Sequence, residues 1–176
     1  MPTVPLDHEQ AAEVIDAMRL RAAQLRTLQL ADDCKYRFGS GTMTAEAARA
    51  FGALVGELRA IEKLDLAATS LDDRGAYALA RLQAETLVDL DISRTKITLD
   101  GLRAILANPR LHHLRRLDLG GITLGEEGAA LLAATPFTQL ETLNLMNCGV
   151  DAEPFRAKYK TVVGDEIWAP VEGYDD

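Results

Sequence analysis

A six-residue apolar pattern, L-x-x-L-x-L, recurs five times along the chain and constrains its fold more than any other feature. Its copies begin at Leu25, Ile61, Leu87, Leu114 and Leu140, and are separated by 36, 26, 27 and 26 residues. A period of this length is typical of solenoids, in which one unit cannot bury its apolar face alone and stacked units share one core.

A strand, a turn and an amphipathic helix are predicted for each copy. The helices are expected to open at glycines that follow the pattern at equivalent places: Gly75, Gly101 and Gly128. They should stop at Asn108-Pro109 and Thr135-Pro136, because a residue before proline disfavours the helical region. We therefore predict an α/β fold, a short right-handed βα solenoid of about five repeats with a concave parallel sheet and convex helices.

One further position strengthens the repeat, because five residues after the second leucine stand Thr69, Thr95, Ile122 and Cys148. With the leucine pattern, this resembles the ribonuclease-inhibitor-like class of leucine-rich repeats, which usually carry Asn, Cys or Thr there. The resemblance covers roughly residues 25–150. It implies helix-containing repeats of about 26 to 29 residues and an intracellular location.

The whole chain, residues 1–176, is expected to form a single domain. Residues 1–24 should form an N-terminal helical cap, in which Asp7 can cap a helix with Gln10 at the third helical position. Residues 25–150 hold the repeats, and residues 151–176 should form a C-terminal cap and an acidic tail, with residues 159–163 and 166–168 as a final extended segment. Within the tail, Trp168 is expected to cover the last repeat.

The longer first interval reflects an insertion near residues 31–41, which should project from the strand-to-helix rim. It mixes cations with aromatics, as binding surfaces often do: Lys35, Tyr36, Arg37 and Phe38. Two interpretations remain open, namely that these side chains bind a partner or that the aromatics fold back on the N-terminal cap.

Two rows of side chains are predicted to point outward from the concave sheet, because side chains alternate along a strand. The first, here called the Asp row, contains Gln29, Asp65, Asp91, Asp118 and Asn144. The second, here called the mixed row, contains Thr27, Lys63, Asp89, Arg116 and Thr142. Three neighbouring carboxylates should raise one another's pKa values, while Lys63 and Arg116 offset part of their charge. The Asp row predicts a binding surface for a cationic group, although Asp at this position is also a common solvated choice.

The formal charge of −8 and a pI near 4.9 argue against nucleic-acid or membrane binding, which need a basic face. A protein partner with a basic surface is favoured. The opening residues lack the pattern of a secretory signal, so a cytoplasmic location is expected. The protein is also expected to be a monomer.

Enzymatic chemistry finds little support in the sequence. The histidines, His8, His112 and His113, include no pair spaced for a metal, and no cofactor motif occurs. The two cysteines are too far apart in the array for a disulfide. Of these, Cys148 should be buried in the core, and Cys34 in the insertion has no nearby His to activate it. We expect no catalytic residue, no metal and no cofactor.

The sequence therefore predicts a non-catalytic protein-binding module, such as an adaptor, inhibitor or immunity-type factor. One alternative is a GTPase-activating factor acting through a rim arginine, Arg74 or Arg94, because Ran GTPase-activating proteins are similar in repeat type. Another alternative is a structural or oligomerisation module.

Overall fold

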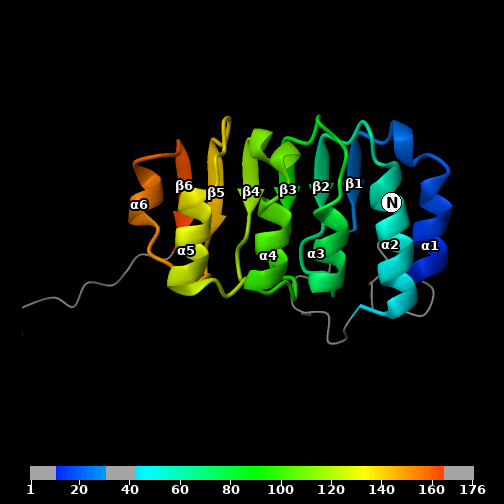
Figure 1. Ribbon diagram of the computed structural model, residues 1–176, viewed down its shortest axis with the longest axis horizontal. Helices are drawn as coiled ribbons and strands as arrows, with labels where there is room; N and C mark the ends of the chain where they lie inside the picture. The colour runs from blue at the N-terminus through cyan, green and yellow to red at the C-terminus, as the bar shows by residue number, and fades with distance from the viewer. Residues whose placement is uncertain (1–10, 31–42, 165–176) are drawn as a thin grey trace, which may run out of the picture.

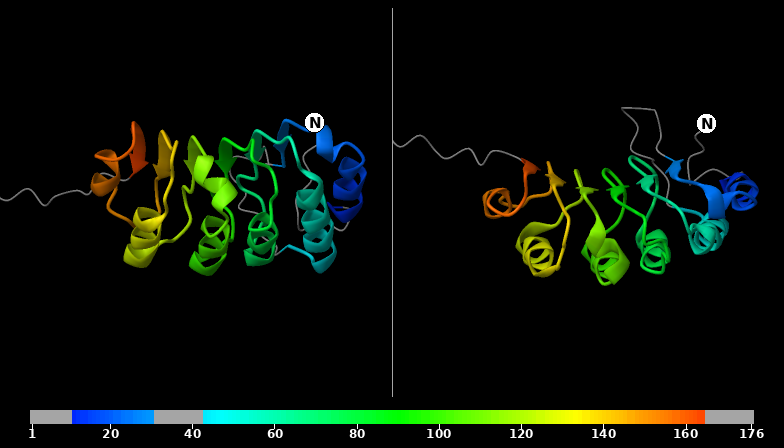
Figure 2. Two further views of the ribbon diagram at one scale, coloured as in Figure 1. Left: turned by 45° about the horizontal axis from the view of Figure 1, so that its top comes forward. Right: turned by 90° about the horizontal axis from the view of Figure 1, so that it is seen from above.

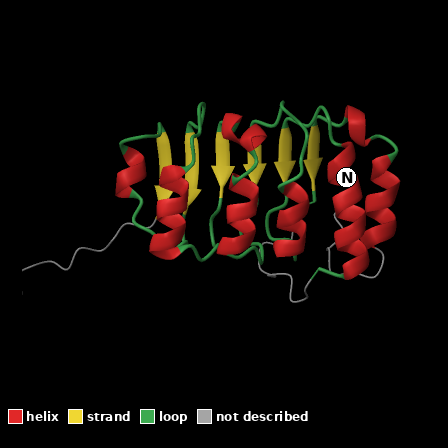
Figure 3. Cartoon of the chain, in the orientation of Figure 1, coloured by secondary structure: helices red, strands yellow, loops and turns green. Residues whose placement is uncertain are grey.

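The structure is a computed structural model that describes residues 11–30 and 43–164. The six strands in these residues form one parallel sheet in the order β1-β2-β3-β4-β5-β6, which confirms the predicted α/β architecture. The strands are β1 Thr27–Gln29, β2 Lys63–Asp65, β3 Asp89–Asp91, β4 Arg116–Asp118, β5 Thr142–Leu145 and β6 Thr161–Gly164. The α-helices are α1 Ala11–Arg19, α2 Ala45–Glu57, α3 Asp73–Leu79, α4 Leu99–Leu106, α5 Gly125–Ala134 and α6 Glu153–Arg156, and the 3-10 helices are η1 Ala22–Gln24 and η2 Pro109–His113. Strands and helices make separate layers (Figure 1, Figure 3).

The register of the sheet places equivalent leucines of successive copies side by side. The central leucines pair in the order Leu28, Leu64, Leu90, Leu117 and Leu143. Each of them is at most 1% exposed, between the sheet and the helices. Burying one leucine side chain contributes about 1.5–3 kcal/mol, so this ladder forms the centre of a continuous core.

The layers curve into a shallow arc with the helices outside and the strands inside (Figure 2). The cause is the different width of the two elements. Neighbouring strands lie about 4.8 Å apart, whereas packed helices lie about 8–10 Å apart, so the helical side of each repeat is wider. The exposed face of the sheet is therefore the concave face, as predicted.

The helices begin two or three residues before the glycines that were expected to open them, so that part of the prediction is wrong. For α3, the side chain of Asp72 accepts a hydrogen bond from the Arg74 amide at 3.0 Å. For α4, the Thr98 hydroxyl accepts from the Asp100 amide at 3.3 Å. These polar side chains determine where the helices begin because they satisfy amide groups that the first turn leaves without a partner.

The glycines lie instead in the first helical turn, where they permit a close approach between neighbouring segments. An added Cβ at Gly75 would lie 2.2 Å from Leu71 Cδ1. At Gly101 it would lie 2.2 Å from Asp73 Oδ1. No side chain fits there without displacing a neighbour.

The two proline-containing helix stops are confirmed. Helix α4 ends at Leu106, and the Asn108 side chain then accepts from the Arg110 amide at 3.1 Å, opening η2 at Pro109. The same side chain donates to the Leu82 carbonyl at 3.0 Å, which links this turn to the preceding repeat. Helix α5 likewise ends at Ala134, before Thr135-Pro136.

The two ends of the sheet differ. At one end α1 packs beside α2, with Ile15 2% exposed, as expected for a helical cap; Asp7 and Gln10 lie outside the described residues. At the other end β6 pairs with β5 as a parallel strand, with Val162 opposite Leu143. The predicted final extended segment is thus a further strand beyond the five pattern copies, and Trp168 lies outside the described residues.

Candidate functional site

The two predicted rows of side chains cross the concave face in register. The Asp row runs over β1 to β5 in the order Gln29, Asp65, Asp91, Asp118 and Asn144, and the mixed row runs in the order Thr27, Lys63, Asp89, Arg116 and Thr142. Residues that are 26 to 36 positions apart in the chain therefore become neighbours on adjacent strands, about 4.8 Å apart.

The Asp and Asn side chains of the Asp row also form a turn at the end of their strands. The Oδ1 atom accepts from the backbone amide two residues later in four successive repeats, an Asx turn. The pairs are Asp65 with Ala67 at 3.0 Å, Asp91 with Ser93 at 3.0 Å, Asp118 with Gly120 at 3.1 Å and Asn144 with Met146 at 3.0 Å. Asp or Asn is therefore needed for the turn, whatever the charge does on the surface.

Asp118 does not face solvent as expected, because its side chain is only 8% exposed. Besides the Gly120 amide, it accepts from Arg116 Nη2 at 2.9 Å and from Asn144 Nδ2 at 3.0 Å. Its carboxylate is thus surrounded by donors of its own repeat and of the next strand. These contacts compensate its burial and leave it poorly placed to meet a partner.

Arg116 carries the charge compensation that was predicted for the mixed row. Its guanidinium lies 3.3 Å from Asp89 Oδ1, 3.8 Å from Asp91 Oδ2 and 2.9 Å from Asp118 Oδ2. Lys63 forms no ion pair within the described residues, although the register places it beside Asp89.

Burial is the largest cause that raises the pKa of the Asp91 carboxyl above its ordinary value of 3.8. Hydrogen bonds from the Ser93 hydroxyl and amide lower this pKa, while the charges of Asp118 and Asp65 raise it further. The predicted repulsion among the row's carboxylates is therefore present at Asp91, but it is secondary to the loss of solvent.

A shallow pocket of about 160 Å³ opens on the concave face over β1 to β4. It is lined by Thr27, Gln29, Lys63, Leu64, Asp65, Asp89, Asp91 and Arg116. Asp89 was not among the predicted binding residues, although its place between Lys63 and Arg116 in the mixed row was a usable signal. Within the described residues, Asp65 accepts its side-chain hydrogen bond from the Ala67 amide.

Comparison with known families bears on the repeat itself. A leucine-rich-repeat family model matches residues 83–106, which contain β3 and α4 together with the third copy of the leucine pattern. The third repeat of this chain is therefore similar to the leucine-rich repeats of that family. A solved structure of leiomodin-1 actin-binding site 2 is similar, with a TM-score of 0.46 and 16% identity over 95% of this chain and 82% of that chain. No curated protein sequence matches the chain.

The repeat also places the position five residues after the second leucine inside the protein. Thr69 is 3% exposed, and its hydroxyl donates to the Leu66 carbonyl at 2.7 Å. Cys148 is fully buried, as predicted, and its Sγ lies 3.1 Å from the Leu119 carbonyl oxygen. The Thr69 and Cys148 side chains thus both pack in the core.

Other predicted residues lie away from the concave pocket. Arg74 is held by Asp72, with Nε and Nη2 at 3.1 and 2.9 Å from Oδ2. Arg94 is exposed on the turn after β3, where its φ is 54°. The insertion residues Lys35, Tyr36, Arg37 and Phe38, together with Cys34, lie outside the described residues.

The histidines and acidic residues do not gather into a metal-binding group in the described part of the chain. His112 is partly buried instead of solvated, because its Nε2 lies 3.0 Å from the Leu106 carbonyl oxygen and its ring meets Phe137 edge-on. Across residues 11–30 and 43–164, no group of three or more metal-binding side chains comes together. No helix in the same residues is long and apolar enough to cross a lipid bilayer.

Proposed function

We propose that this protein acts by binding and not by catalysis, and that its concave face recognises a basic group on a protein partner. The observation that carries the proposal is the uneven state of the carboxylates on that face. Asp118 accepts three hydrogen bonds from the protein itself, whereas Asp65 accepts one among the described residues and lines the same pocket as Asp89 and Asp91.

The capacity of Asp65 follows from a count of acceptors. An ionised carboxylate offers about four acceptor positions, and Asp65 uses one for the Ala67 amide among the described residues. No cation of the described residues lies within ion-pair distance of it, and Arg116 is engaged with the other carboxylates. A lysine or arginine from a partner would therefore find its best acceptors at β2 and β3.

The surroundings of this pocket fit a protein interface better than a small-molecule site. The pocket is small, and it lies on a sheet face that continues beyond it over β5 and β6 (Figure 2). The insertion follows β1 in the chain, so we propose that Lys35, Tyr36, Arg37 and Phe38 extend the same surface. An adaptor, an inhibitor and an immunity-type factor would each use such a surface.

The test compares Asp65→Asn with the wild-type protein in affinity capture from a lysate of the native host. Asparagine keeps the Oδ1 acceptor that the Asx turn needs, as Asn144 does in its own repeat, and removes only the charge. We expect the affinity of the captured partner to fall about tenfold, the value of one charge-assisted contact near 1.4 kcal/mol.

The matched control is Asp100→Asn, which removes one negative charge from an exposed side chain on α4, on the convex side. It should leave capture unchanged. A partner retained equally by the wild-type protein and Asp65→Asn would contradict the concave site. Charge reversal of Asp118 is a poor test, because it would bury an unpaired charge beside Arg116 and disturb the fold.

A further inference from the structure

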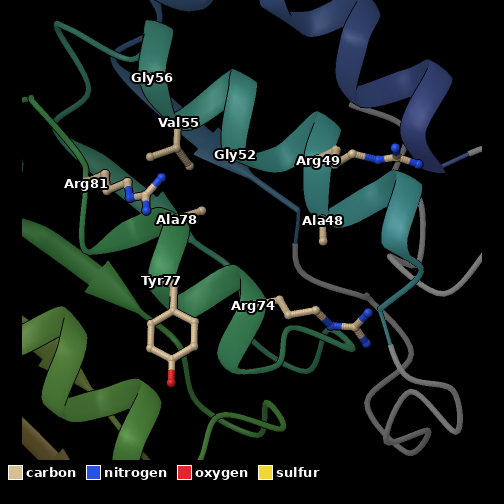
Figure 4. A pocket seen from close by; sticks show the side chains of 9 residues that line it. All are labelled: Ala48, Arg49, Gly52, Val55, Gly56, Arg74, Tyr77, Ala78 and Arg81. Atoms are coloured by element: carbon tan, nitrogen blue, oxygen red, sulfur yellow. The ribbon is translucent and has the colours of Figure 1, made fainter.

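A second groove, of about 360 Å³, lies on the convex face between α2 and α3 (Figure 4). Three arginines line it, namely Arg49, Arg74 and Arg81. None of its described lining residues is acidic. The exposed ring of Tyr77 forms part of its wall. This groove is basic in a protein with a formal charge of −8, which makes the local excess of positive charge unusual for the chain.

Arg49 and Arg81 are the arginines most available to a ligand. Arg49 pairs with Glu46 at 3.0 Å and Arg74 with Asp72 at 2.9 Å, and both arginine side chains are more than half exposed. Both partners of the Arg49–Glu46 pair are exposed, so this pair contributes little stability and exchanges readily, whereas the Asp72 side chain that holds Arg74 is only 17% exposed. The guanidinium of Arg81 has no hydrogen-bond or ion-pair partner within the described residues.

Two glycines of helix α2 line the groove, although glycine lowers the stability of a helix. Ala48, Gly52 and Gly56 follow one another at four-residue spacing and so lie on one face of the helix. Glycine is a poor helix former, yet an added Cβ at Gly52 would make an ordinary 3.8 Å contact with Ala78, and one at Gly56 would meet nothing within 4 Å. Neither glycine has a positive φ. Internal packing therefore does not account for either glycine, whereas a ligand that approaches the helix backbone closely would.

We propose that this convex groove binds an acidic peptide segment of a protein partner. The arginines lie toward opposite ends of the groove, with Arg81 at one end and Arg49 and Arg74 at the other (Figure 4). Arg74 lies in α3 and Arg81 in the turn that follows it, and seven residues at the helical rise span about 10 Å. An extended peptide rises about 3.3 Å per residue, so carboxylates three residues apart would reach both ends.

The groove is separate from the concave site in position and in charge. The helices place it on the opposite side of the sheet from Asp65 (Figure 2). Loss of either site would therefore leave the other unaffected, and the two proposals can fail independently.

The experiment uses a fluorescein-labelled peptide, Glu-Glu-Ala-Glu-Glu, titrated with the full chain and followed by fluorescence anisotropy. We expect saturable binding that Arg81→Gln weakens about fivefold, since one exposed charge-assisted contact is lost. Gly56→Leu should weaken it about tenfold or more by filling the groove. Leucine is the better helix former, so this second variant loses the groove without losing the fold.

Two controls separate the groove from general effects. Arg115→Gln removes the same charge from an exposed side chain outside the groove. Ala130→Leu fills a comparable groove between α5 and α6 whose charged lining residues are Glu126 and Asp151. Both should bind the peptide as the wild-type protein does.

Three outcomes would overturn the proposal. They are absence of peptide binding up to millimolar protein, equal binding by the wild-type protein and both groove variants, and tighter binding of a single-stranded oligonucleotide or of phosphatidylserine vesicles than of the peptide. The last outcome would assign the arginines to a different class of partner.

Discussion

Ala68, Arg94 and Asn147 each occupy the left-handed region of backbone space, with φ of 56°, 54° and 56°. They stand three residues after Asp65, Asp91 and Asn144, so each Asx turn is followed by one residue in this conformation. The equivalent residue after Asp118 is Gly121, with φ of 81°. A side chain with a Cβ atom is strained there by about 1–2 kcal/mol, and glycine is not.

Ala68→Gly should therefore stabilise the protein. We expect the free energy of unfolding to rise by about 0.5–1 kcal/mol, because relief of strain exceeds the added entropy of the unfolded chain. Urea denaturation measures the change. The control Ala78→Gly, within α3, should instead lower it by about 1 kcal/mol, and equal losses in both variants would contradict the backbone argument.

At the scale of single elements, the glycines of α2 and α4 have different roles. A Cβ on Gly101 would press on Asp73 Oδ1, which accepts from the Thr98 amide at 2.8 Å and so ties the start of α4 to the preceding repeat. A Cβ on Gly52 meets only an ordinary contact. The same substitution should therefore have opposite effects in the two helices.

We expect Gly101→Ala to lower the free energy of unfolding by about 1–2 kcal/mol, since the cost of overpacking exceeds the gain in helix propensity. Gly52→Ala should raise it by about 1 kcal/mol. Thermal denaturation monitored by circular dichroism would show the two changes in stability. Destabilisation by Gly52→Ala would mean that α2 and α3 pack more tightly than the structure indicates.

At the scale of the whole molecule, strand order equals chain order, so each strand pairs only with its immediate neighbours. Stability in such a solenoid is approximately a sum of unit and nearest-neighbour contributions. Strands β3 and β4 have neighbours on both sides. Strand β6 pairs on one side, with β5, among the described residues, and Val163 in it is exposed.

Native-state hydrogen exchange should therefore show a gradient of protection. Amides of β3 and β4 should exchange only on global unfolding, whereas those of β6 should open locally with a free energy several-fold smaller. The β1 end should be better protected than β6, because α1 and α2 pack closely together at that end and Leu28 in β1 is buried. Uniform protection across the sheet would show instead that the array unfolds as one cooperative unit.

The sequence by itself determined the parallel sheet, its register, the buried leucines and the two rows on the concave face. It could do so because each repeat records the same periodicity locally, and stacking places equal positions side by side. The burial of Asp118, the pairing of β6 with β5 and the groove between α2 and α3 were decided only in the tertiary structure. Asp118 is buried because Arg116 and, on the next strand, Asn144 both donate hydrogen bonds to it. The segment that forms β6 has no copy of the leucine pattern from which its pairing could be predicted. The groove depends on the distance between α2 and α3. Side chains of two different repeats determine this distance, so no single repeat encodes it.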